Sequence, residues 1–349
     1  MTGDPGDFKA LLGRVAQGRA LSEAEAETAF DMIMSGDATP SQMGAFLMAL
    51  RVRGESVDEI AGAARIMRAK AVHIDAPEGT IDTCGTGGDA SGSFNISTAT
   101  ALVVAGSGVP VAKHGNRALS SKSGSADVLT ALGVNIEADL SIVRRCLWEI
   151  GIGFLMAPRH HSATRHVAPT RVELGTRTIF NLLGPLSSPA EARYQLVGVF
   201  APEWVVPMAE VLGRLGARRA WVVHGEGLDE VTTAGKTTVA AYDKGKVESF
   251  TLAPEDVGLP RARLEDLKGG EPQLNARLMT ELLAGAKGPL RDIVLFNSAA
   301  ALVVAGRAAD LGAGIERAAA AIDSGAARRV LERLVALTNS APAPKETAR

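Results

Sequence analysis

Hydrophobic positions in the first seventy residues repeat at the spacing of α-helices. In residues 11–15 and 43–50, apolar side chains fall three or four positions apart, which places them on one helix face. Ser22 followed by Glu25 matches the capping box that begins many helices. The stretch shows no strand-like run of alternating apolar and polar residues. The pattern therefore predicts an all-helical unit over residues 1–74.

A different pattern begins after the linker at residues 75–79. Short apolar runs alternate there with helical stretches, which is typical of an α/β domain with a mainly parallel central sheet. The predicted strands cover residues 109–112, 153–156, 195–200 and 220–223. We therefore expect a larger α/β domain over residues 80–340.

Three later segments predict further elements. Residues 236–252 are polar and β-branched and are interrupted by Lys244-Gly245-Lys246, which favours a hairpin. Residues 293–305 are strongly apolar, but they are few and include an asparagine and a serine. They predict a buried helix rather than a membrane span. Residues 313–337 form the last long helical run.

Composition narrows the classes of function. The chain of 349 residues is 46% hydrophobic and 22% charged, which is ordinary for a globular protein long enough for two domains. A formal net charge of −2 argues against a general nucleic-acid binder. Aromatic residues, at 4%, supply few platforms for stacked bases. We therefore expect no nucleic-acid partner.

The cysteines and the N-terminus favour a reducing compartment. Cys84 and Cys146 lack metal-binding spacing and are too few for a disulfide framework. Nothing in the sequence around Cys84 favours a thiolate, so a small spacer is the expected role rather than a nucleophile. The N-terminus lacks the apolar region of a signal peptide. We expect a cytoplasmic protein with no membrane partner.

The run Asp82–Asp89, with the sequence DTCGTGGD, is the first candidate for anion binding. Its three glycines let the backbone approach an anion and adopt positive φ. Asn95, Ser97 and Thr98 follow where an apolar helix begins, and helix N-termini bind anions. The dinucleotide fingerprint fails because position 90 is alanine, and no P-loop occurs. Another kind of phosphate site is implied; the alternative is an ordinary glycine-rich turn with a serine cap.

A second candidate loop follows the predicted strand at residues 109–112. Lys113, Arg117 and Lys122 share this strand-to-helix segment with four serines between positions 120 and 125. Lysine binds phosphate as a point charge and arginine as a fork. The segment therefore predicts a cradle for a polyanion; the alternative is a solvated charged loop.

The third candidate is the adjacent pair Asp229 and Glu230, which follows the predicted strand at residues 220–223 and a glycine-rich turn. Ligands of open α/β sheets bind beyond the carboxyl ends of strands. Paired carboxylates suit Mg²⁺, which prefers oxygen ligands. Such pairs also occur as ordinary surface residues.

Together these runs resemble the anthranilate phosphoribosyltransferase family. The resemblance is carried, in order and over nearly the whole chain, by Asp82–Asp89, Asn95–Thr98, Lys113–Asp127, Arg171–Pro185 and Leu228–Glu230. Nucleoside phosphorylases share the fold, but in the thymidine-phosphorylase type the Lys-His segment continues as Ser-Thr-Gly-Gly. Here Gly-Asn-Arg follows. A non-catalytic nucleic-acid-binding relative should show a basic surface and a damaged carboxylate pair, and neither is seen in the sequence.

The resemblance implies a pentosyltransferase of tryptophan biosynthesis, acting at its second step. The 5-phosphoribosyl group of phosphoribosyl pyrophosphate would pass to the amine of anthranilate, giving N-(5-phosphoribosyl)anthranilate and pyrophosphate. Two Mg²⁺ ions are expected. The resemblance also implies that helices near residues 165–185 join the N-terminal unit, that the active site lies between the domains, and that the protein is a homodimer.

The resemblance assigns residues to each ligand. Those expected to bind phosphoribosyl pyrophosphate are Gly85, Gly88, Asp89, Ser93, Asn95, Ile96, Ser97, Thr98, Lys113, His114, Gly115, Asn116, Arg117, Ala118, Leu119, Ser120, Ser121 and Ser125. Those expected to contact anthranilate are Gly85, Asn116 and Arg171. Those expected to hold Mg²⁺ are Ser97, Asp229 and Glu230.

The acceptor side leaves two points open. An arginine fork is a natural holder of the anthranilate carboxylate, and Arg171 is the matching position. Arg177 is a competitor, and its other explanation is a salt bridge on a helix face. His114 lies between Lys113 and Arg117, which should disfavour its cationic form, so packing, hydrogen bonding and base chemistry stay open. No Ser-His-Asp or Cys-His set is evident, and the reaction needs no enzyme nucleophile.

Overall fold

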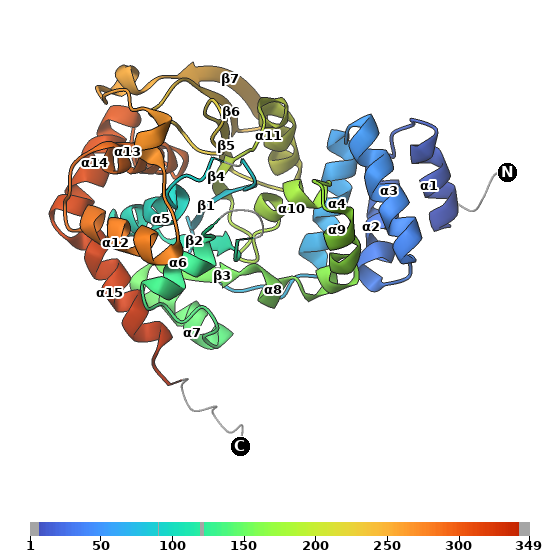
Figure 1. The fold of residues 1–349 in the computed structure, drawn as a ribbon, viewed down its shortest axis with the longest axis horizontal. Helices are drawn as coiled ribbons and strands as arrows, with labels where there is room; N and C mark the ends of the chain where they lie inside the picture. Colours follow the sequence, from blue (N-terminus) through green and yellow to red (C-terminus); the bar gives the residue numbers. More distant parts are fainter. Residues whose placement is uncertain (1–6, 90, 119–121, 342–349) are drawn as a thin grey trace.

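The computed structural model describes residues 7–89, 91–118 and 122–341 (Figure 1). Its first elements are α1 (Phe8–Ala16), α2 (Glu23–Ser35), α3 (Pro40–Arg53) and α4 (Val57–Ala69). Capping boxes begin α2, α3 and α4. The predicted box is confirmed, because the Ser22 backbone N–H donates to Glu25 Oε2 at 2.9 Å. These caps pair N–H groups that the first helical turn leaves free.

Helices from the middle of the chain pack onto this N-terminal bundle. They are α9 (Ala168–Leu174) and α10 (Phe180–Leu186), whereas the short α8 (Ala157–His160) follows β3 and packs against it. The Phe180 ring centroid lies 5.7 Å from that of Phe30, whose ring also packs edge-on against Phe46. In Figure 1, α9 and α10 accordingly lie beside α3 and α4. The division into residues 1–74 and 80–340 stays a prediction.

The α/β part is built on a sheet that has seven strands within the described residues, in the order β3-β2-β1-β4-β5-β6-β7. The strands are β1 (Ile81–Gly85), β2 (Val111–Gly115), β3 (Ile152–Met156), β4 (Tyr194–Gly198), β5 (Arg219–His224), β6 (Thr237–Asp243) and β7 (Lys246–Leu252). β1 to β5 run parallel, whereas β6 and β7 pair antiparallel. The predicted, mainly parallel sheet is confirmed.

The central strand β1 is absent from the sequence prediction. Its residues include Asp82 and Thr83, which are 0% and 2% exposed. Because these polar side chains break the apolar run, the segment resembles a loop in sequence. The first half of the DTCGTGGD run is therefore a buried strand, and the loop begins only at Thr86.

The predicted hairpin is confirmed as β6 and β7. Its two turn residues, Lys244 and Gly245, have φ of 48° and 85°. Two successive positive φ angles are typical of the type I′ turn, whose twist matches that of the flanking strands. The hairpin extends the sheet beyond β5, away from the parallel strands that carry the motifs.

Helices surround the sheet. They are α5 (Ile96–Gly106), α6 (Ser125–Ala131), α7 (Leu140–Arg145), α11 (Val205–Arg214), α12 (Pro272–Leu283), α13 (Pro289–Val304), α14 (Leu311–Asp323) and α15 (Ala326–Thr338). The predicted buried helix is α13, in which Phe296, Asn297 and Ser298 are 0% exposed. Among the described helices, none has the length and apolarity needed to cross a membrane.

The long helical run predicted over residues 313–337 is two helices. α14 ends at Asp323 and α15 begins at Ala326. Gly325, between them, has a φ of 71°, which is outside the helical range. The apolar spacing continues across the break because both helices pack on the same core, so the spacing alone did not show it.

Candidate active site

The three candidate loops follow strands at one edge of the sheet. β1, β2 and β5 belong to the parallel part, so their carboxyl ends point the same way. The glycine loop follows β1, the Lys113 loop begins on β2, and the Asp229–Glu230 turn follows β5. This edge is where open α/β sheets bind ligands.

Lys113 and Ser97 join these three segments. Lys113 is 3% exposed, and its Nζ donates to Thr83 O at 2.6 Å and to Ser97 Oγ at 3.2 Å. The Ser97 backbone N–H in turn donates to Glu230 Oε1 at 3.1 Å. The positive end of α5, predicted as an anion site, thus receives a carboxylate of the protein itself. Lys113 and the Asp229–Glu230 turn therefore meet at Ser97.

Asp229 and Glu230 lie partly buried among like charges. Asp229 Oδ2 accepts the Gly87 N–H at 2.7 Å, and the Asp229 N–H faces Asp89 Oδ2 at 3.5 Å. Burial, followed by the charge of Asp89, raises the pKa of Asp229 to about 7. Burial and the charge of Asp229 likewise raise the pKa of Glu230. The site therefore favours a cation or a proton that neutralises these two crowded carboxylates.

The donor set fits Mg²⁺ delivered with a phosphorylated substrate. Asp229, Glu230 and the Ser97 hydroxyl offer hard oxygen ligands, which this ion prefers. Among the described residues, no group of three or more His, Cys, Asp or Glu side chains is arranged to enclose a metal. Mg²⁺ commonly keeps several waters and binds through one or two carboxylates plus substrate phosphates. An open, incomplete set is therefore compatible with this ion.

A second network holds the start of α5. Asn95 Nδ2 donates to Ser123 O at 3.1 Å, and Asn95 Oδ1 accepts from Asn275 Nδ2 at 2.8 Å. The backbone of Ser93 pairs with that of Lys268, from a distant segment, in an isolated antiparallel β-bridge. The Ile96 and Thr98 side chains are each 1% exposed. In this conformation Ile96 can therefore offer a ligand only its backbone.

The loop after β2 is organised by Asp127. Its Oδ2 accepts the N–H groups of Ala118 and Gly124, both at 2.9 Å. Its Oδ1 lies 3.4 Å from Arg117 Nη1. Ser125 Oγ, at the start of α6, donates to Asn116 O at 3.3 Å, so residues 115–118 lie beside the first turn of that helix. Leu119, Ser120 and Ser121 lie outside the described residues.

His114 is a buried, neutral group. Burial, followed by the nearby His161, lowers the pKa of His114 to about 3. The two ring centroids are 5.1 Å apart, and His114 Nδ1 lies 3.2 Å from Gly184 O. The predicted direction agrees, but the main cause is burial rather than Lys113 and Arg117. Such a histidine packs and hydrogen-bonds, and it is a weak base at neutral pH.

Cys84 has the surroundings of a spacer. Its side chain is 8% exposed, and burial together with Asp82 raises the pKa of its thiol well above the usual value. Asp82 Oδ1 accepts the His114 N–H at 3.2 Å, which ties β1 to β2. A thiol held protonated in this way is a poor nucleophile.

Arg171 and Arg177 have different partners. The Arg171 guanidinium carbon lies 5.2 Å from the Phe180 ring centroid, and burial lowers its pKa. Among the described residues, Arg171 has no acidic partner within salt-bridge distance, and no direct contact joins it to Asn116 or Gly85. Arg177 Nη2 instead donates to Gly88 O. The helix-face salt bridge considered for Arg177 is therefore not what the structure contains.

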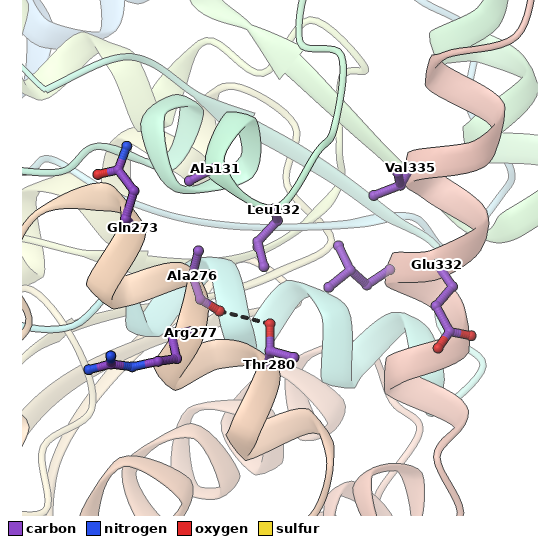
Figure 2. A pocket seen from close by; sticks show the side chains of 9 residues that line it. Ala131, Leu132, Gln273, Ala276, Arg277, Thr280, Glu332 and Val335 are labelled. Atoms are coloured by element: carbon purple, nitrogen blue, oxygen red, sulfur yellow. Dashed lines mark hydrogen bonds between the residues drawn. The ribbon is translucent and has the colours of Figure 1, made fainter.

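Two cavities among the described residues lie away from these loops. One, of about 600 Å³, is bounded by α6, α12 and α15 and includes Leu132 and Val335 in its lining (Figure 2). The hydrogen bond drawn there, from Thr280 to Ala276 at 2.8 Å, lies within α12. The other, of similar volume, lies beside the linker residues 73–80. Neither contains a motif residue.

Asn275 and Asn297 were missed as residues of the site in the sequence, and Arg177, named there as a competitor for the acceptor, has a different partner. Asn275 supports Asn95, and Arg177 contacts the glycine loop rather than the acceptor group. Asn297 Nδ2 and Oδ1 bond Val231 O at 2.7 Å and Val231 N at 2.9 Å, next to the carboxylate pair. The sequence contained a signal for Asn275 and Asn297, because each is a polar residue on an apolar helix face.

Comparison with protein families gives two matches along the chain. Residues 9–71 match the helical bundle domain of a glycosyl transferase family, and residues 78–328 match the a/b domain of the same family. The fold and these matches thus define the chain as a glycosyl transferase.

Individual relatives narrow this class. The anthranilate phosphoribosyltransferase of Azospirillum brasilense is 66% identical over 97% of this chain and 95% of its own. A crystal structure of anthranilate phosphoribosyltransferase from Thermus thermophilus is 48% identical, with a TM-score of 0.90 over 95% of this chain and 99% of that one. The Saccharomyces cerevisiae enzyme in complex with PRPP and Mg is 31% identical, with a TM-score of 0.85 over 97% and 100%. The chain belongs to the anthranilate phosphoribosyltransferase family.

Proposed function

We propose that this protein transfers the 5-phosphoribosyl group of phosphoribosyl pyrophosphate to the amine of anthranilate. The products are N-(5-phosphoribosyl)anthranilate and pyrophosphate, and the reaction is the second step of tryptophan biosynthesis. The observation that carries the proposal is that Lys113 and the Asp229–Glu230 turn meet at Ser97, while the Gly87 N–H bonds the glycine loop to the same turn. The family to which the chain belongs supports the same reaction.

The chemistry needs charge stabilisation more than a reactive side chain. As pyrophosphate leaves, the ribose C1 develops oxocarbenium character, as in glycoside chemistry. The protein has to neutralise the leaving group and hold the amine against C1. Lys113 supplies a fixed positive charge, and the glycine loop supplies backbone that a phosphate can approach.

We assign the donor site to the loops described above. Its members are Gly85, Gly88, Asp89, Ser93, Asn95, Ile96, Ser97, Thr98, Lys113, His114, Gly115, Asn116, Arg117, Ala118 and Ser125, with Leu119, Ser120 and Ser121 outside the described residues. Because Asn95 is already bonded to Ser123 and Asn275, its part is to hold the loops together as much as to touch the ligand.

We assign Mg²⁺ to Ser97, Asp229 and Glu230, and we propose two ions. When bound, Mg²⁺ neutralises charge on the pyrophosphate as it departs. The raised pKa values of both carboxylates support the assignment, because a bound cation would offset both the burial and the like-charge repulsion that raise them. The yeast relative in complex with PRPP and Mg supports the use of this ion.

We assign the acceptor to Gly85, Asn116 and Arg171. A buried guanidinium without an acidic partner among the described residues suits a carboxylate brought by the substrate. The bond of Arg177 to Gly88 and its packing on Phe200 support Arg171 rather than Arg177 for this role. No residue is assigned as nucleophile or base.

Anthranilate fluorescence tests the reaction. The signal should fall only when phosphoribosyl pyrophosphate and Mg²⁺ are both present. The double variant Asp229→Asn/Glu230→Gln should lose this turnover by about a hundredfold or more, since several kcal/mol of charge stabilisation is removed. Glu226→Gln, an exposed carboxylate of the same turn, is the matched control. Metal-independent turnover, or full activity of the double variant, would contradict the proposal.

We also propose a homodimer formed through the outer face of the helical unit. Val52 on α3 and Val172 on α9 are 81% and 80% exposed, and these two helices are neighbours. Exposed apolar side chains on adjacent helices suit a self-complementary twofold contact. Light scattering should give twice the chain mass, and Val52→Glu should shift it toward the monomer.

A cytoplasmic location is proposed because both cysteines are free thiols.

A further inference from the structure

Arg177 crosses from the non-helical connection between α9 and α10 to the loop that follows β1. Its Nη2 donates to Gly88 O, and its guanidinium carbon lies 4.3 Å from the centroid of the Phe200 ring. Resting on the proposed function, we propose that Arg177 is a positioning residue that holds the glycine loop, residues 85–89, in the shape that accepts phosphoribosyl pyrophosphate.

The glycine loop has reason to need such support. Gly87 and Gly88 have φ of 65° and 72°, and two successive glycines in this region can adopt many other conformations. The first half of the loop is held by Thr86 N–H on Gly198 O at 2.9 Å and by Gly87 N–H on Asp229 Oδ2 at 2.7 Å. Arg177 holds the next carbonyl, that of Gly88. It does so from the segment that continues into α10.

Phe200 fixes the guanidinium that makes this contact. The ring supports one face of Arg177, an arrangement that arginine favours through cation–π attraction and stacking. The Phe200 backbone N–H donates to Thr86 Oγ1 at 3.0 Å. The ring and the loop are therefore anchored to each other, so Arg177 binds a surface that already has a defined shape.

The position of Arg177 separates its role from that of Arg171. Both lie on the segment between residues 168 and 180, but Arg171 packs on Phe180 whereas Arg177 contacts the donor loop. Ordering a loose loop costs binding free energy, and a loop that is already ordered avoids that cost. Loss of Arg177 should therefore weaken the donor rather than the acceptor.

The test compares Arg177→Met, Arg177→Lys and a matched control. Arg144→Met is the control, because Arg144 also lies over an aromatic ring, 5.8 Å from the Trp148 centroid, but on α7 outside the site. Calorimetry with phosphoribosyl pyrophosphate and Mg²⁺ should show Arg177→Met weakening Kd about tenfold, the size of one lost charge-assisted bond. Arg177→Lys should fall between wild type and Arg177→Met, and Arg144→Met should match wild type.

Steady-state kinetics then distinguish positioning from general damage. In Arg177→Met, KM for phosphoribosyl pyrophosphate should rise with the measured Kd while KM for anthranilate stays within about twofold. Equal rises in both KM values, or an unchanged donor Kd, would overturn the proposal. If Arg177→Met melts early, Phe200→Leu removes the supporting ring alone, and the same donor-selective loss is required of it.

The outcomes also separate this inference from the proposed function. If wild type binds phosphoribosyl pyrophosphate but leaves anthranilate fluorescence unchanged, the proposed function fails while the calorimetric test of Arg177 still stands. If wild type turns over and Arg177→Met binds the donor normally, the proposed function stands and the positioning role fails. A double-mutant cycle should show Arg177→Met and Phe200→Leu to be less than additive.

Discussion

The backbone of Asp229 rests directly on Gly198, so closely that a β-carbon at position 198 would lie 1.5 Å from the Asp229 carbonyl oxygen. Gly85, the register partner of Gly198 across β1 and β4, has the same restriction, because its β-carbon would lie 2.3 Å from Asp229 Oδ2. Two paired glycines thus leave a bare patch of sheet on which the carboxylate turn sits. The patch sets the distance between the turn and the glycine loop.

Gly198→Ala should displace Asp229 and lower activity. The added methyl meets backbone, which cannot rotate away, so the turn has to move and some stability is lost, about 1–3 kcal/mol as in other overpacked sites. We expect turnover to fall at least about tenfold and the Mg²⁺ concentration for half-activity to rise. Gly13→Ala, whose β-carbon would meet nothing within 4 Å, is the control. A Mg²⁺ titration that matches wild type would contradict the role of this contact.

Asn275→Ala should weaken the donor site from a distance. Asn275 is 1% exposed, and it bonds Asn95 through Nδ2 and the Gly270 N–H through Oδ1, each at 2.8 Å. Alanine leaves the Gly270 N–H without its partner and removes one of the two bonds that Asn95 Oδ1 accepts, at a cost of about 1–3 kcal/mol. We expect a lower melting temperature and a several-fold higher KM for phosphoribosyl pyrophosphate. Gln273→Ala, exposed on the same helix, should change neither.

The local parts of this fold and site were predictable, and the missing parts have a common cause. Capping boxes, the hairpin and the three motif loops are encoded in short stretches, so spacing and residue type sufficed. β1 was missed because Asp82 and Thr83 are buried polar residues, whose side chains bond the His114 N–H of β2 and Ser97 O of α5. A run of residues can be central to a sheet without being apolar when other strands satisfy its polar groups.

The long-range contacts of the site could not be read from any one motif. Asn275 lies 180 positions from Asn95, and Arg177 lies 89 positions from Gly88. Each pair depends on where the tertiary fold brings two segments, which local pattern does not encode. The same holds for the pKa of His114, where burial outweighs the charges of its sequence neighbours.

Arg171→Ala should act on the acceptor. Removing a charge-assisted contact to the anthranilate carboxylate costs about 1.5–3 kcal/mol, which is roughly a tenfold to hundredfold rise in KM for anthranilate. KM for phosphoribosyl pyrophosphate should change much less. Arg165→Ala, an arginine shortly before α9, is the control. Equal changes in both KM values would make Arg171 a structural residue.

His161 should make the protein sensitive to acid. The side chain is 3% exposed, and neither ring nitrogen has a hydrogen-bond partner among the described residues. Burial, followed by the nearby His160, lowers the pKa of His161 to about 4. An unfolded chain has no such surroundings, so its histidine titrates near the ordinary value of about 6.5.

The sign of the effect follows from proton counts. Between pH 6.5 and 4 the unfolded state binds more protons at this position than the folded state, so the free energy of unfolding falls as pH falls. The full difference is about 3 kcal/mol for a displacement of this size. His161→Phe keeps an aromatic ring, loses no described hydrogen bond and cannot titrate. Urea unfolding from pH 7 to pH 4 should show a shallower decline in this variant than in wild type, with stability at pH 7 equal or higher. Parallel declines in the two proteins would mean that His161 is charged in the folded state, contrary to its burial.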